Sequence, residues 1–430
     1  MNRRDFLRKT TAAAAAGVSF PYFIPSGVLA APGRLGPNDR IKVGFIGCGG
    51  RAGHLMFTEK LSDNADVVAL ADCFMPRCDE KAAKLPKGDQ IKKYGNYQEM
   101  LEKEKLDAVF VPTTTHARAL IVIHAMQAGL DVYAEKPLTL TIEEGQVLRQ
   151  AVRRYKRILQ VGTQQRSIPI NAWASQQLRE GAIGRITEVI ACNFLAPEIW
   201  KPQPEQPKPA GLDWDQWCNQ TELRPYHRDL HFGWSRWRDY DGGGMSWGVS
   251  GWGTHALDQV QCVLGTDDTG PVEIWPDGPD DQGFMKVTMR YENGTLLKCH
   301  GPRRKPELHD LGAIFIGEKG KVEIVRGDFF CDPPDLLKGG PKRQDSNIPG
   351  EVVEHIRNFF DCMRTRKKPN ADVETAHRSN TVCHLFNICR ELNRKLKWDP
   401  KAEEFIGDEE ANKLRSRPRR KGYELPEMAV

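Results

Sequence analysis

The stretch IKVGFIGCGGRAG, residues 41–53, decides how the rest of this sequence is interpreted. Its opening run, IKVGFIG, is apolar and ends in glycine, which is typical of a buried strand. Gly47, Gly49 and Ala52 then form the pattern G-x-G-x-x-A. In this pattern the first glycine permits a tight turn, the second lets the backbone approach a pyrophosphate, and the third, small residue lets a helix pack on the strand. The pyrophosphate would lie at the helix N-terminus, where free N–H groups and the helix dipole favour anions.

A second apolar run, DVVALAD, ends in Asp72, about 20 residues beyond Gly49. An acidic side chain at this place hydrogen-bonds an adenosine ribose hydroxyl and repels a ribose phosphate, so NAD is favoured over NADP. Arg77 lies near enough in sequence to keep NADP as the lesser alternative. Strand, loop, helix, strand and acid in this order predict a dinucleotide-binding domain.

Strand and helix patterns continue to alternate after this unit. Strand patterns cover 106–113, 130–137 and 157–166, and helical patterns cover 116–129 and 141–155. Repeated strand–helix units predict a doubly wound parallel sheet, which binds its ligands at the carboxyl ends of the strands. The candidate cofactor contacts at these ends are Thr113, His116, Glu135, Lys136 and Gln164, in addition to Gly47, Gly49, Ala52 and Asp72.

Several segments resemble the Gfo/Idh/MocA oxidoreductases, a family named for glucose–fructose oxidoreductase and inositol dehydrogenase, and in particular its exported branch. The likeness implies an α/β protein: an N-terminal Rossmann domain with a doubly wound parallel sheet, followed by an α+β domain with an open, mostly antiparallel sheet. That second sheet would face the nicotinamide and make the contact of a homo-oligomer. The segments are AEKP (134–137), LDWDQW to RPYH (212–227), WRDYDGGG (237–244), WGTHALDQV (252–260) and RNFFDCMRTRKKPNADVETAHRS (357–379).

The resemblance also assigns two candidate catalytic residues. Lys136 matches the lysine that touches the nicotinamide ribose and the substrate hydroxyl, and His255 matches the acid–base histidine of the family pattern Asp-x-Gly-x-His. A cation can steady a developing alkoxide and imidazole titrates near neutrality, so both suit oxidation of a hydroxyl group. The structural alternatives are a packing histidine and a surface lysine. The sequence departs from the family at Gly251, where the pattern has aspartate. The carboxylates that could replace it are Asp239, Asp241 and Asp258.

The N-terminal segment NRRDFLR carries Arg3 and Arg4, followed by Phe, Leu and Arg, which is a twin-arginine pattern. A weakly apolar, alanine-rich run follows, and small residues at VLAAPG allow cleavage after Ala30 or Ala31. The alternative is an amphipathic N-terminus that contains two arginines by chance. We expect a twin-arginine signal peptide and a periplasmic or extracellular protein that folds and binds its cofactor before export.

Composition indicates a globular chain. The 430 residues carry a formal net charge of +5, too little to indicate nucleic-acid binding, and no apolar stretch after the leader is long enough to span a membrane. The 11 cysteines lack paired spacing, and His227 and His231 lie in a turn-rich stretch, so neither a disulfide framework nor a metal site is predicted. The basic run 415–421 is interpreted as a solvated tail.

The expected divisions are a signal peptide (1–31), an NAD-binding Rossmann domain (38–166), a substrate and oligomerisation domain (167–398) and a C-terminal tail (399–430).

Seven of the ten tryptophans lie between Trp200 and Trp252. Their rings could stack on a sugar or hold long loops together, and both interpretations stay open. The stretch His377–Leu396 is expected to form an amphipathic helix, in which His377 and His384 make hydrogen bonds between elements.

These features predict an exported NAD-dependent oxidoreductase that acts on a sugar, glycoside or polyol by hydride transfer. Because little free NAD is present outside the cytoplasm, we expect tightly bound NAD and return of the hydride within one catalytic cycle. The alternatives are an NAD-dependent glycosidase or lyase that oxidises a ring transiently, and a non-catalytic protein that binds sugar and NAD, suggested by Gly251. The expected partners are a small carbohydrate and further copies of the chain.

Overall fold

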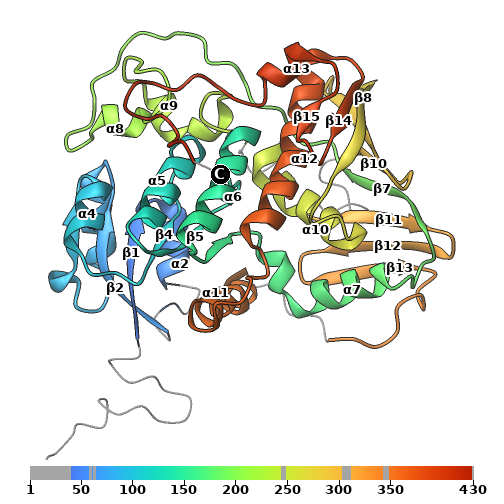
Figure 1. Ribbon diagram of the computed structural model, residues 1–430, viewed down its shortest axis with the longest axis horizontal. Coiled ribbons are helices and arrows are strands. Elements are labelled where there is room, and N and C mark those ends of the chain that lie inside the picture. Colours follow the sequence, from blue (N-terminus) through green and yellow to red (C-terminus); the bar gives the residue numbers. More distant parts are fainter. Residues whose placement is uncertain are drawn as a thin grey trace, which may run out of the picture. The chain divides into compact units, whose positions relative to one another are not determined.

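A six-stranded parallel sheet forms the first half of the protein in the computed structural model, which describes residues 40–57, 61, 64–243, 248–302, 311–341 and 348–428 (Figure 1). The strand order is β3-β2-β1-β4-β5-β6, and each neighbouring pair is parallel. This arrangement confirms the predicted doubly wound sheet. The strand order reverses between β1 and β4, so their carboxyl ends form the crevice where such sheets bind ligands. The strands are β1 (Ile41–Ile46), β2 (Ala65–Ala71), β3 (Lys92–Tyr94), β4 (Ala108–Val111), β5 (Asp131–Ala134) and β6 (Leu159–Val161).

Helices cover this sheet, and α6 (Ile142–Tyr155) begins at a side-chain cap. The Thr141 hydroxyl accepts the Glu144 backbone N–H and caps α6. Helix α5 is buried along almost its whole length because other segments cover the side that does not face the sheet. The predicted signal peptide lies outside the described residues. The helices of this half are α2 (Gly50–Phe57), α3 (Met75–Ala82), α4 (Tyr97–Lys103), α5 (Thr115–Gln127) and α6 (Ile142–Tyr155), with a 3₁₀ turn at Gly88–Gln90.

A nine-stranded sheet forms the second half, with the order β13-β12-β11-β7-β10-β9-β8-β14-β15. Only the β7–β10 pair is parallel among the pairs that the structure describes, so the predicted open, mostly antiparallel sheet is confirmed. The strands are β7 (Ile186–Cys192), β8 (Pro271–Pro279), β9 (Met285–Tyr291), β10 (Leu296–Gly301), β11 (Ala313–Gly317), β12 (Gly320–Val325), β13 (Asp328–Asp332), β14 (Leu396–Asp399) and β15 (Glu404–Phe405).

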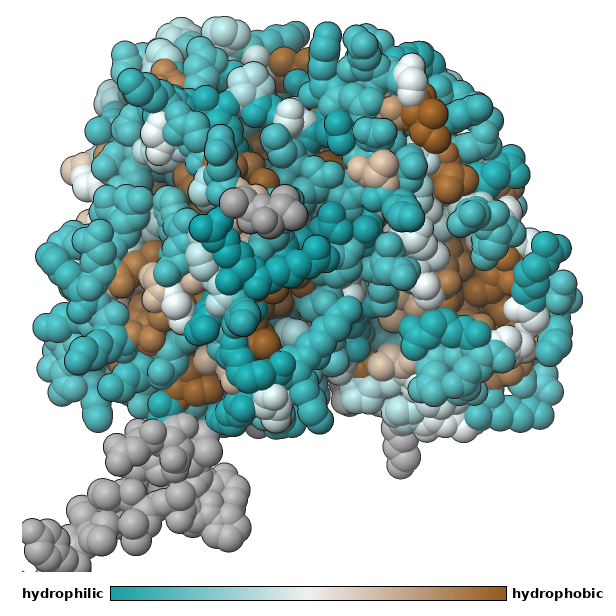
Figure 2. Space-filling view, viewed as in Figure 1, coloured by the Kyte–Doolittle hydropathy of each residue, from teal (hydrophilic) through white to brown (hydrophobic). Residues whose placement is uncertain are grey.

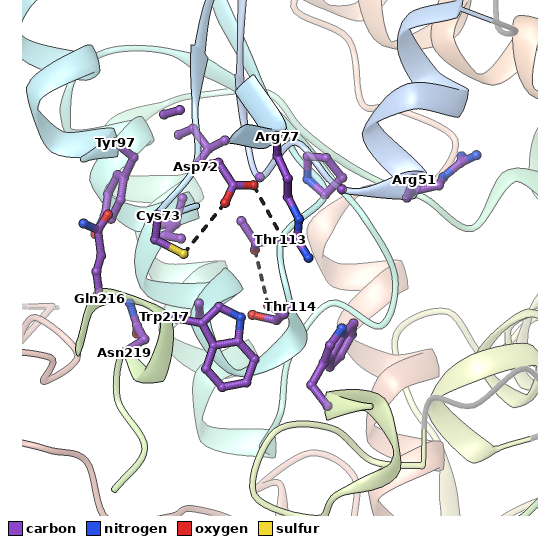
Figure 3. A pocket seen from close by; sticks show the side chains of 18 of the residues that line it. Arg51, Asp72, Cys73, Arg77, Tyr97, Thr113, Thr114, Gln216, Trp217 and Asn219 are labelled. Atoms are coloured by element: carbon purple, nitrogen blue, oxygen red, sulfur yellow. Dashed lines mark hydrogen bonds and ion pairs between the residues drawn. The ribbon is translucent and has the colours of Figure 1, made fainter. Parts of the chain in front are cut away.

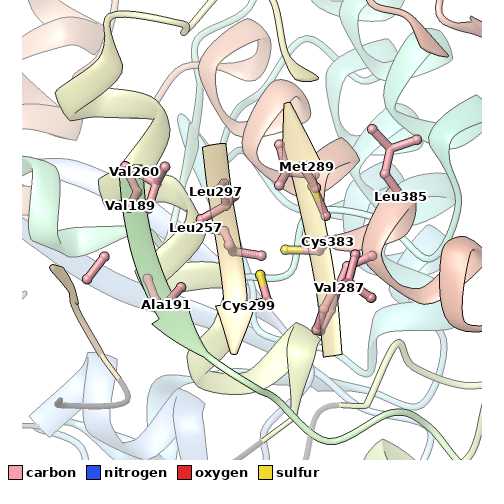
Figure 4. Packing of buried hydrophobic residues seen from close by; sticks show 14 of the residues in the cluster. Val189, Ala191, Leu257, Val260, Val287, Met289, Leu297, Cys299, Cys383 and Leu385 are labelled. Carbon is pink, nitrogen blue, oxygen red and sulfur yellow. The ribbon is translucent and has the colours of Figure 1, made fainter. Parts of the chain in front are cut away.

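Helices cover one face of this second sheet and bury its apolar side chains. Alternate residues of β7, β9 and β10 point toward α10 and α12, where Leu257 and Cys383 meet them (Figure 4). Helix α12 is buried on nearly all sides because it also packs against α6 of the first half. The expectation of an amphipathic helix is therefore wrong for this segment. The helices are α7 (Pro169–Arg179), α10 (Thr254–Leu264), α12 (Val373–Leu392) and α13 (Glu409–Lys413), with a 3₁₀ turn at Gln164–Ser167 and a π-helical turn at Val249–Gly253.

The C-terminal part of the chain returns to complete the first half. Phe359 and Phe360 of α11 (Ile348–Thr365) pack against Phe110 of β4 in the core of the parallel sheet. The basic run is half-buried and paired rather than a solvated tail, because Arg419 pairs with Glu144 and Arg420 pairs with Asp215. These contacts fasten the C-terminal end of the chain to both the first half and the tryptophan-rich segment.

The tryptophan-rich segment, residues 211–240, lies over α5 on the outside of the parallel sheet (Figure 1). It contains α8 (Trp214–Cys218), α9 (Arg228–Phe232) and a 3₁₀ turn at Trp234–Arg236. Trp214 and Trp217 stack with their ring centroids 4.5 Å apart and form a small core with Tyr226 and Tyr240. Loops without a large sheet of their own are thus held together by aromatic packing.

The visible face of the protein is predominantly hydrophilic and is broken by small hydrophobic patches (Figure 2). In the described part of the chain, no helix has both the length and the apolar character needed to cross a bilayer. All the cysteines are free thiols, and Cys73 and Cys331 are the two that are half-buried rather than buried.

Candidate active site

The first of two adjoining cavities lies at the carboxyl ends of β1 and β2 and has a volume of about 230 Å³ (Figure 3). The loop after β1 and the start of α5 form one wall, with Gly47, Gly49 and Thr113 exposed to the cavity. Helix α8 and the residue that follows it form the opposite wall, with Trp217 and Asn219. The cavity therefore lies at the switch point of the parallel sheet, where a dinucleotide is expected.

The glycine pattern has the backbone geometry that the sequence predicts. Gly47 has a φ of +94°, and a Cβ atom there would lie 2.9 Å from the Thr113 side chain. A Cβ atom on Gly49 would meet nothing within 4 Å, so open space lies above the loop at the N-terminus of α2. Ala52 is fully buried in the core, as close packing of the helix on the strand requires. The loop thus leaves room for a pyrophosphate beside free helical N–H groups.

Asp72 follows the last residue of β2 and is fixed by the glycine loop itself. One carboxylate oxygen accepts the Cys48 backbone N–H at 2.7 Å, and the other accepts the Phe74 N–H at 2.8 Å. Arg77 lies 4.0 Å from the carboxylate, and Figure 3 shows Asp72 between Arg77 and Cys73. Because a carboxylate can accept about four hydrogen bonds, both oxygens can still accept ribose hydroxyls. Open space above Gly49 and an oriented acid in one cavity fit an adenine dinucleotide.

The tryptophan-rich segment forms the outer wall of this cavity. Leu212 pairs with Phe74 in a short antiparallel bridge, and the Asp213 backbone N–H donates to the Cys73 carbonyl at 2.8 Å. Gln216, Trp217 and Asn219 then face the cavity across from Asp72 (Figure 3). Trp214 stacks on Trp217 and Trp200 packs against Trp237, so the interpretation that these rings hold loops together is supported. Trp217 and Trp234 also line the cavities, and stacking on a sugar stays a prediction. Trp247 lies outside the described residues.

The second cavity has a volume of about 340 Å³ and lies between the two halves of the protein. Arg51, Pro112, Thr113 and Trp234 line both cavities, so the two spaces adjoin at these residues. The side chains that reach only the second cavity come from distant parts of the sequence. They include Glu135, Lys136, Gln164, Asp241, Ser250 and His255.

Lys136 is the central cation of the second cavity. Its Nζ donates a hydrogen bond of 3.0 Å to the backbone carbonyl of Gly251. Burial lowers the pKa of Lys136 from 10.5 to about 8, against the opposing effect of the carboxylates of Glu135 and Asp241. Lys136 is thus not a surface lysine; it is a cation at neutral pH that loses its proton more readily than a solvated lysine.

His255 is buried at the start of α10 and lines the same cavity. Burial lowers its pKa well below 6.5, and the positive charges of Arg326, Lys136 and Arg51 lower it further. Its Nδ1 has no hydrogen-bond partner among the described residues. A neutral imidazole in a cavity can accept a proton, so this position is compatible with an acid–base role.

The three carboxylates considered as replacements for the family aspartate have different surroundings. Asp258 is buried in an ion pair of 2.8 Å with Arg166 and accepts the Ser379 hydroxyl. Asp239 is partly exposed and pairs with Arg224 at 2.7 Å. Asp241 alone of these three lines the second cavity.

The other predicted contacts divide between the two cavities. Glu135 accepts the Arg51 Nε–H at 2.6 Å and, with Gln164, lines the second cavity rather than the first. His116 lines neither cavity: its Nε2 lies 2.8 Å from the Trp217 carbonyl, and its backbone N–H donates to Tyr240. His116 is the second residue of α5, and both of these contacts are to the tryptophan-rich segment. His116 therefore holds that segment against α5.

Three arginines of the second cavity were not among the predicted site residues. Arg51 lies inside the glycine pattern and could have been suspected from its position. Arg118 donates to the carbonyls of Thr113 and Pro137 and so ties together two strand ends. Arg326 directly follows β12, and no motif in the sequence marks it.

The two histidines with metal-like spacing have other contacts. His231 is buried among the rings of Phe74, Trp214 and Trp217, and the Nδ1 of His227 accepts the Asp229 backbone N–H at the start of α9. Within the described residues, no group of three or more His, Cys, Asp or Glu side chains is arranged to hold a metal ion. His377 and His384 make the expected contacts between elements, to Glu403 and Thr139.

Comparison with known proteins follows the same division into two halves. Residues 41–163 match a model described as an oxidoreductase family NAD-binding Rossmann fold, and residues 199–425 match the C-terminal alpha/beta domain of the same family. The chain belongs to the Gfo/Idh/MocA oxidoreductase family. As in that family, the first half is an NAD-binding domain, and the protein is an oxidoreductase.

The similarity to individual relatives extends over most of the chain. A scyllo-inositol 2-dehydrogenase (NAD(+)) of Bacillus subtilis is 32% identical over 71% of this chain and 80% of its own length. The WlbA dehydrogenase of Bordetella pertussis, solved with NADH and UDP-GlcNAcA, has a TM-score of 0.60 at 16% identity and covers 84% of this chain and 99% of its own. An aldose-aldose oxidoreductase of Caulobacter crescentus has a TM-score of 0.58 at 16% identity, over 83% and 99%. At these low identities the two solved structures establish the fold.

Proposed function

We propose that this protein is an exported dehydrogenase that oxidises a ring or chain hydroxyl of a sugar or polyol with NAD that it keeps bound. The observation that carries the proposal is the junction of the two cavities, where Lys136, Asp241 and His255 face a space that adjoins the dinucleotide cavity. The inositol dehydrogenase of Bacillus subtilis, a relative over most of the chain, supports a polyol or sugar as the substrate.

The residues of the second cavity can perform the proton chemistry of this reaction. When bound, NAD supplies the acceptor for the hydride of the alcohol carbon. Lys136 can stabilise the negative charge that develops on the oxygen, because its buried ammonium group carries its charge in a site shielded from water. His255 is neutral at physiological pH and can take the hydroxyl proton. Trp234, which lines both cavities, can cover the apolar face of a sugar ring.

The walls of the first cavity support retention of NAD. The tryptophan-rich segment is fastened to the parallel sheet at Leu212, Asp213 and His116. The C-terminal end of the chain fastens the same segment from outside through Arg420. Because this wall is held at several points, we expect NAD to be released slowly.

The test of retention compares turnover with and without added NAD. Purified protein should contain NAD after dialysis, and myo-inositol and D-glucose serve as the first polyol and sugar to be tried. Reduction of the bound nicotinamide by either compound, followed by absorbance, would support the oxidoreductase assignment. Steady turnover that strictly requires external NAD, with NADH accumulating in step with product, would contradict retention and leave an ordinary dehydrogenase.

Export is proposed from the twin-arginine pattern at Arg3 and Arg4. The twin-arginine route carries folded proteins, so the dinucleotide can be bound in the cytoplasm before export. Replacement of both residues, Arg3→Lys and Arg4→Lys, should leave the protein in the cytoplasm, as measured by immunoblotting of cell fractions. Unchanged export of this variant would contradict the proposal that the protein is exported by the twin-arginine route.

A homo-oligomer is also proposed, formed through the outer face of the nine-stranded sheet. Phe330 of β13 is 47% exposed, and two further side chains of the same sheet, Ile314 of β11 and Ile190 of β7, are only partly buried. Light scattering of the purified protein should give more than one chain per particle, and Phe330→Asp should shift that mass toward a single chain. A single chain per particle in the unmodified protein would contradict this proposal.

A further inference from the structure

The family carboxylate is absent from the position where the sequence pattern places it. Gly251 occupies that position, and its backbone carbonyl accepts the Lys136 Nζ–H at 3.0 Å. A carbonyl can orient the lysine, but it adds no negative charge to the cavity and leaves one lone pair at most for a substrate hydroxyl. A second acceptor in the cavity is therefore needed if the substrate is to be held by a carboxylate.

Asp241 has the properties of such an acceptor. It is completely buried from the outside and lines the cavity that also contains Lys136 and His255. Neither of its carboxylate oxygens has a hydrogen-bond partner of acceptable geometry among the described residues. Buried carboxylates are nearly always paired or hydrogen-bonded, because removing the charge from water without compensation is strongly unfavourable. An unsatisfied one aimed into a cavity is suited to a ligand that brings donors.

The charged groups around Asp241 come from several elements. Arg118 lies on α5, Lys136 follows β5, and His255 is at the start of α10. Arg51, Arg326 and Glu135 complete the charged lining of the cavity. The Thr115 hydroxyl and the Gly242 backbone N–H lie near the carboxylate and also favour its charged form, although neither contact has the geometry of a hydrogen bond. The positive charges keep Asp241 largely ionised at neutral pH although it is buried.

We propose that Asp241 is the substrate-binding carboxylate of this protein and that it accepts a hydrogen bond from a hydroxyl group of the sugar or polyol, in place of the aspartate that the family has at position 251. The proposal rests on the oxidoreductase function proposed above. The carboxylate binds and orients the hydroxyl, and no proton transfer to it is required. The substrate class that follows is a neutral polyhydroxy compound, which supplies donors to Asp241 and an acceptor to Lys136.

The direct test replaces Asp241 by a side chain of the same shape without charge. Asp241→Asn should lower kcat/KM for the responsive compound, myo-inositol or D-glucose, about tenfold to a hundredfold, the loss expected for one hydrogen bond to a charged group. The amount of bound NAD should not change, since Asp241 does not line the dinucleotide cavity. The matched control is Asp239→Asn, two residues away, whose carboxylate pairs with Arg224 outside both cavities. This control should keep its kcat/KM.

A second readout needs no substrate. Burial raises the pKa of Asp241 from 3.8 to about 6, so the folded protein binds more protons than the unfolded chain between these pH values. Stability therefore falls as pH rises through this window, and the loss remains at higher pH. Asp241→Asn lacks this penalty, so its Tm should exceed that of the unmodified protein at about pH 8 and approach it at about pH 4. A residue with a structural role would give the opposite result, a lower Tm.

The outcomes separate this inference from the proposed function. If the unmodified protein oxidises a sugar and Asp241→Asn does so equally well, the inference is overturned while the function stands. A lower Tm of Asp241→Asn at about pH 8, or failure of this variant to fold, also overturns it, because the carboxylate would then be structural. If no tested sugar reduces the bound cofactor, the proposed function fails, and the Tm comparison alone decides whether Asp241 is held in the cavity at a cost to stability.

Discussion

The two cavities differ in how the sequence builds them. The dinucleotide cavity is built on a glycine loop after β1 and an acid after β2, and the tryptophan-rich segment closes it as an outer wall. The second cavity is formed by side chains from separate segments, among them Lys136, Asp241 and His255. The glycine loop and the acid depend little on how the two halves pack, whereas the second cavity, made from distant side chains, depends on it directly. Variants should therefore separate cofactor binding from chemistry.

The largest difference between retained NAD binding and lost turnover is expected for variants of the catalytic candidates. Lys136→Met and His255→Ala should each lower turnover about a hundredfold or more, the range for loss of a group that acts in proton transfer. Both variants should retain bound NAD, because neither side chain lines the dinucleotide cavity. Turnover of the responsive sugar and the NAD content after dialysis are the two measurements.

A control for packing accompanies these two variants. His255 is buried, and loss of its ring leaves a cavity in the protein, so the Tm of each variant is measured alongside its activity. Loss of NAD and of cooperative unfolding together with activity would assign His255 to packing and remove it from the catalytic group. Normal turnover of Lys136→Met would contradict the role of Lys136 as the cation that stabilises the negative charge on the substrate oxygen.

The same contrast explains what could be predicted from the sequence. The strands at 41–47, 106–113 and 130–137 were predictable because each is a short apolar run with polar residues at its end. Strand β3 was not predicted, since Lys92–Tyr94 is a three-residue edge strand without an apolar core-facing pattern. The glycine pattern and Asp72 lie in one cavity as expected, because parallel strands bring their carboxyl ends together.

Contacts between distant segments were the part that the sequence could not specify. Three carboxylates were equal candidates in the sequence, and only packing distinguishes Asp241 from Asp239 and Asp258. The local sequence of the basic run indicates a solvated segment, because its partners Glu144 and Asp215 lie more than two hundred residues earlier. Similarly, α12 contains polar residues at positions that face α6, and these are buried only because the two halves meet.

Asp72 lines the dinucleotide cavity and does not line the second one. Asp72→Ala should weaken NAD binding about tenfold to a hundredfold, because it removes a charged hydrogen-bond acceptor for the ribose. NADP binding should weaken less, since the variant also removes the repulsion of a ribose phosphate and leaves Arg77 in place. Titration of apo protein with each dinucleotide measures both affinities. Equal loss for the two, or no loss, would exclude Asp72 from the ribose site.

The smallest effect is expected at the outer wall of the dinucleotide cavity. Arg420 donates to the Asn219 carbonyl through Nε at 3.0 Å and through Nη2 at 2.9 Å, and Asn219 itself lines the cavity. The Arg420 backbone N–H also donates to the Gln220 carbonyl, so the C-terminal end of the chain holds this turn at several atoms.

In Arg420→Ala the side-chain contacts are lost, each a partly solvated hydrogen bond of about 1 kcal/mol, and the wall should open more often. The dissociation rate of NAD should rise a few-fold, as followed by exchange of the bound cofactor for a fluorescent analogue, while turnover with NAD bound should stay unchanged. Lys421→Ala, an exposed neighbour in the same basic run, is the matched control and should leave the rate as it is. If both variants release NAD at the rate of the unmodified protein, the C-terminal contacts do not retain the cofactor, and retention depends on the cavity floor formed by the glycine loop and Asp72.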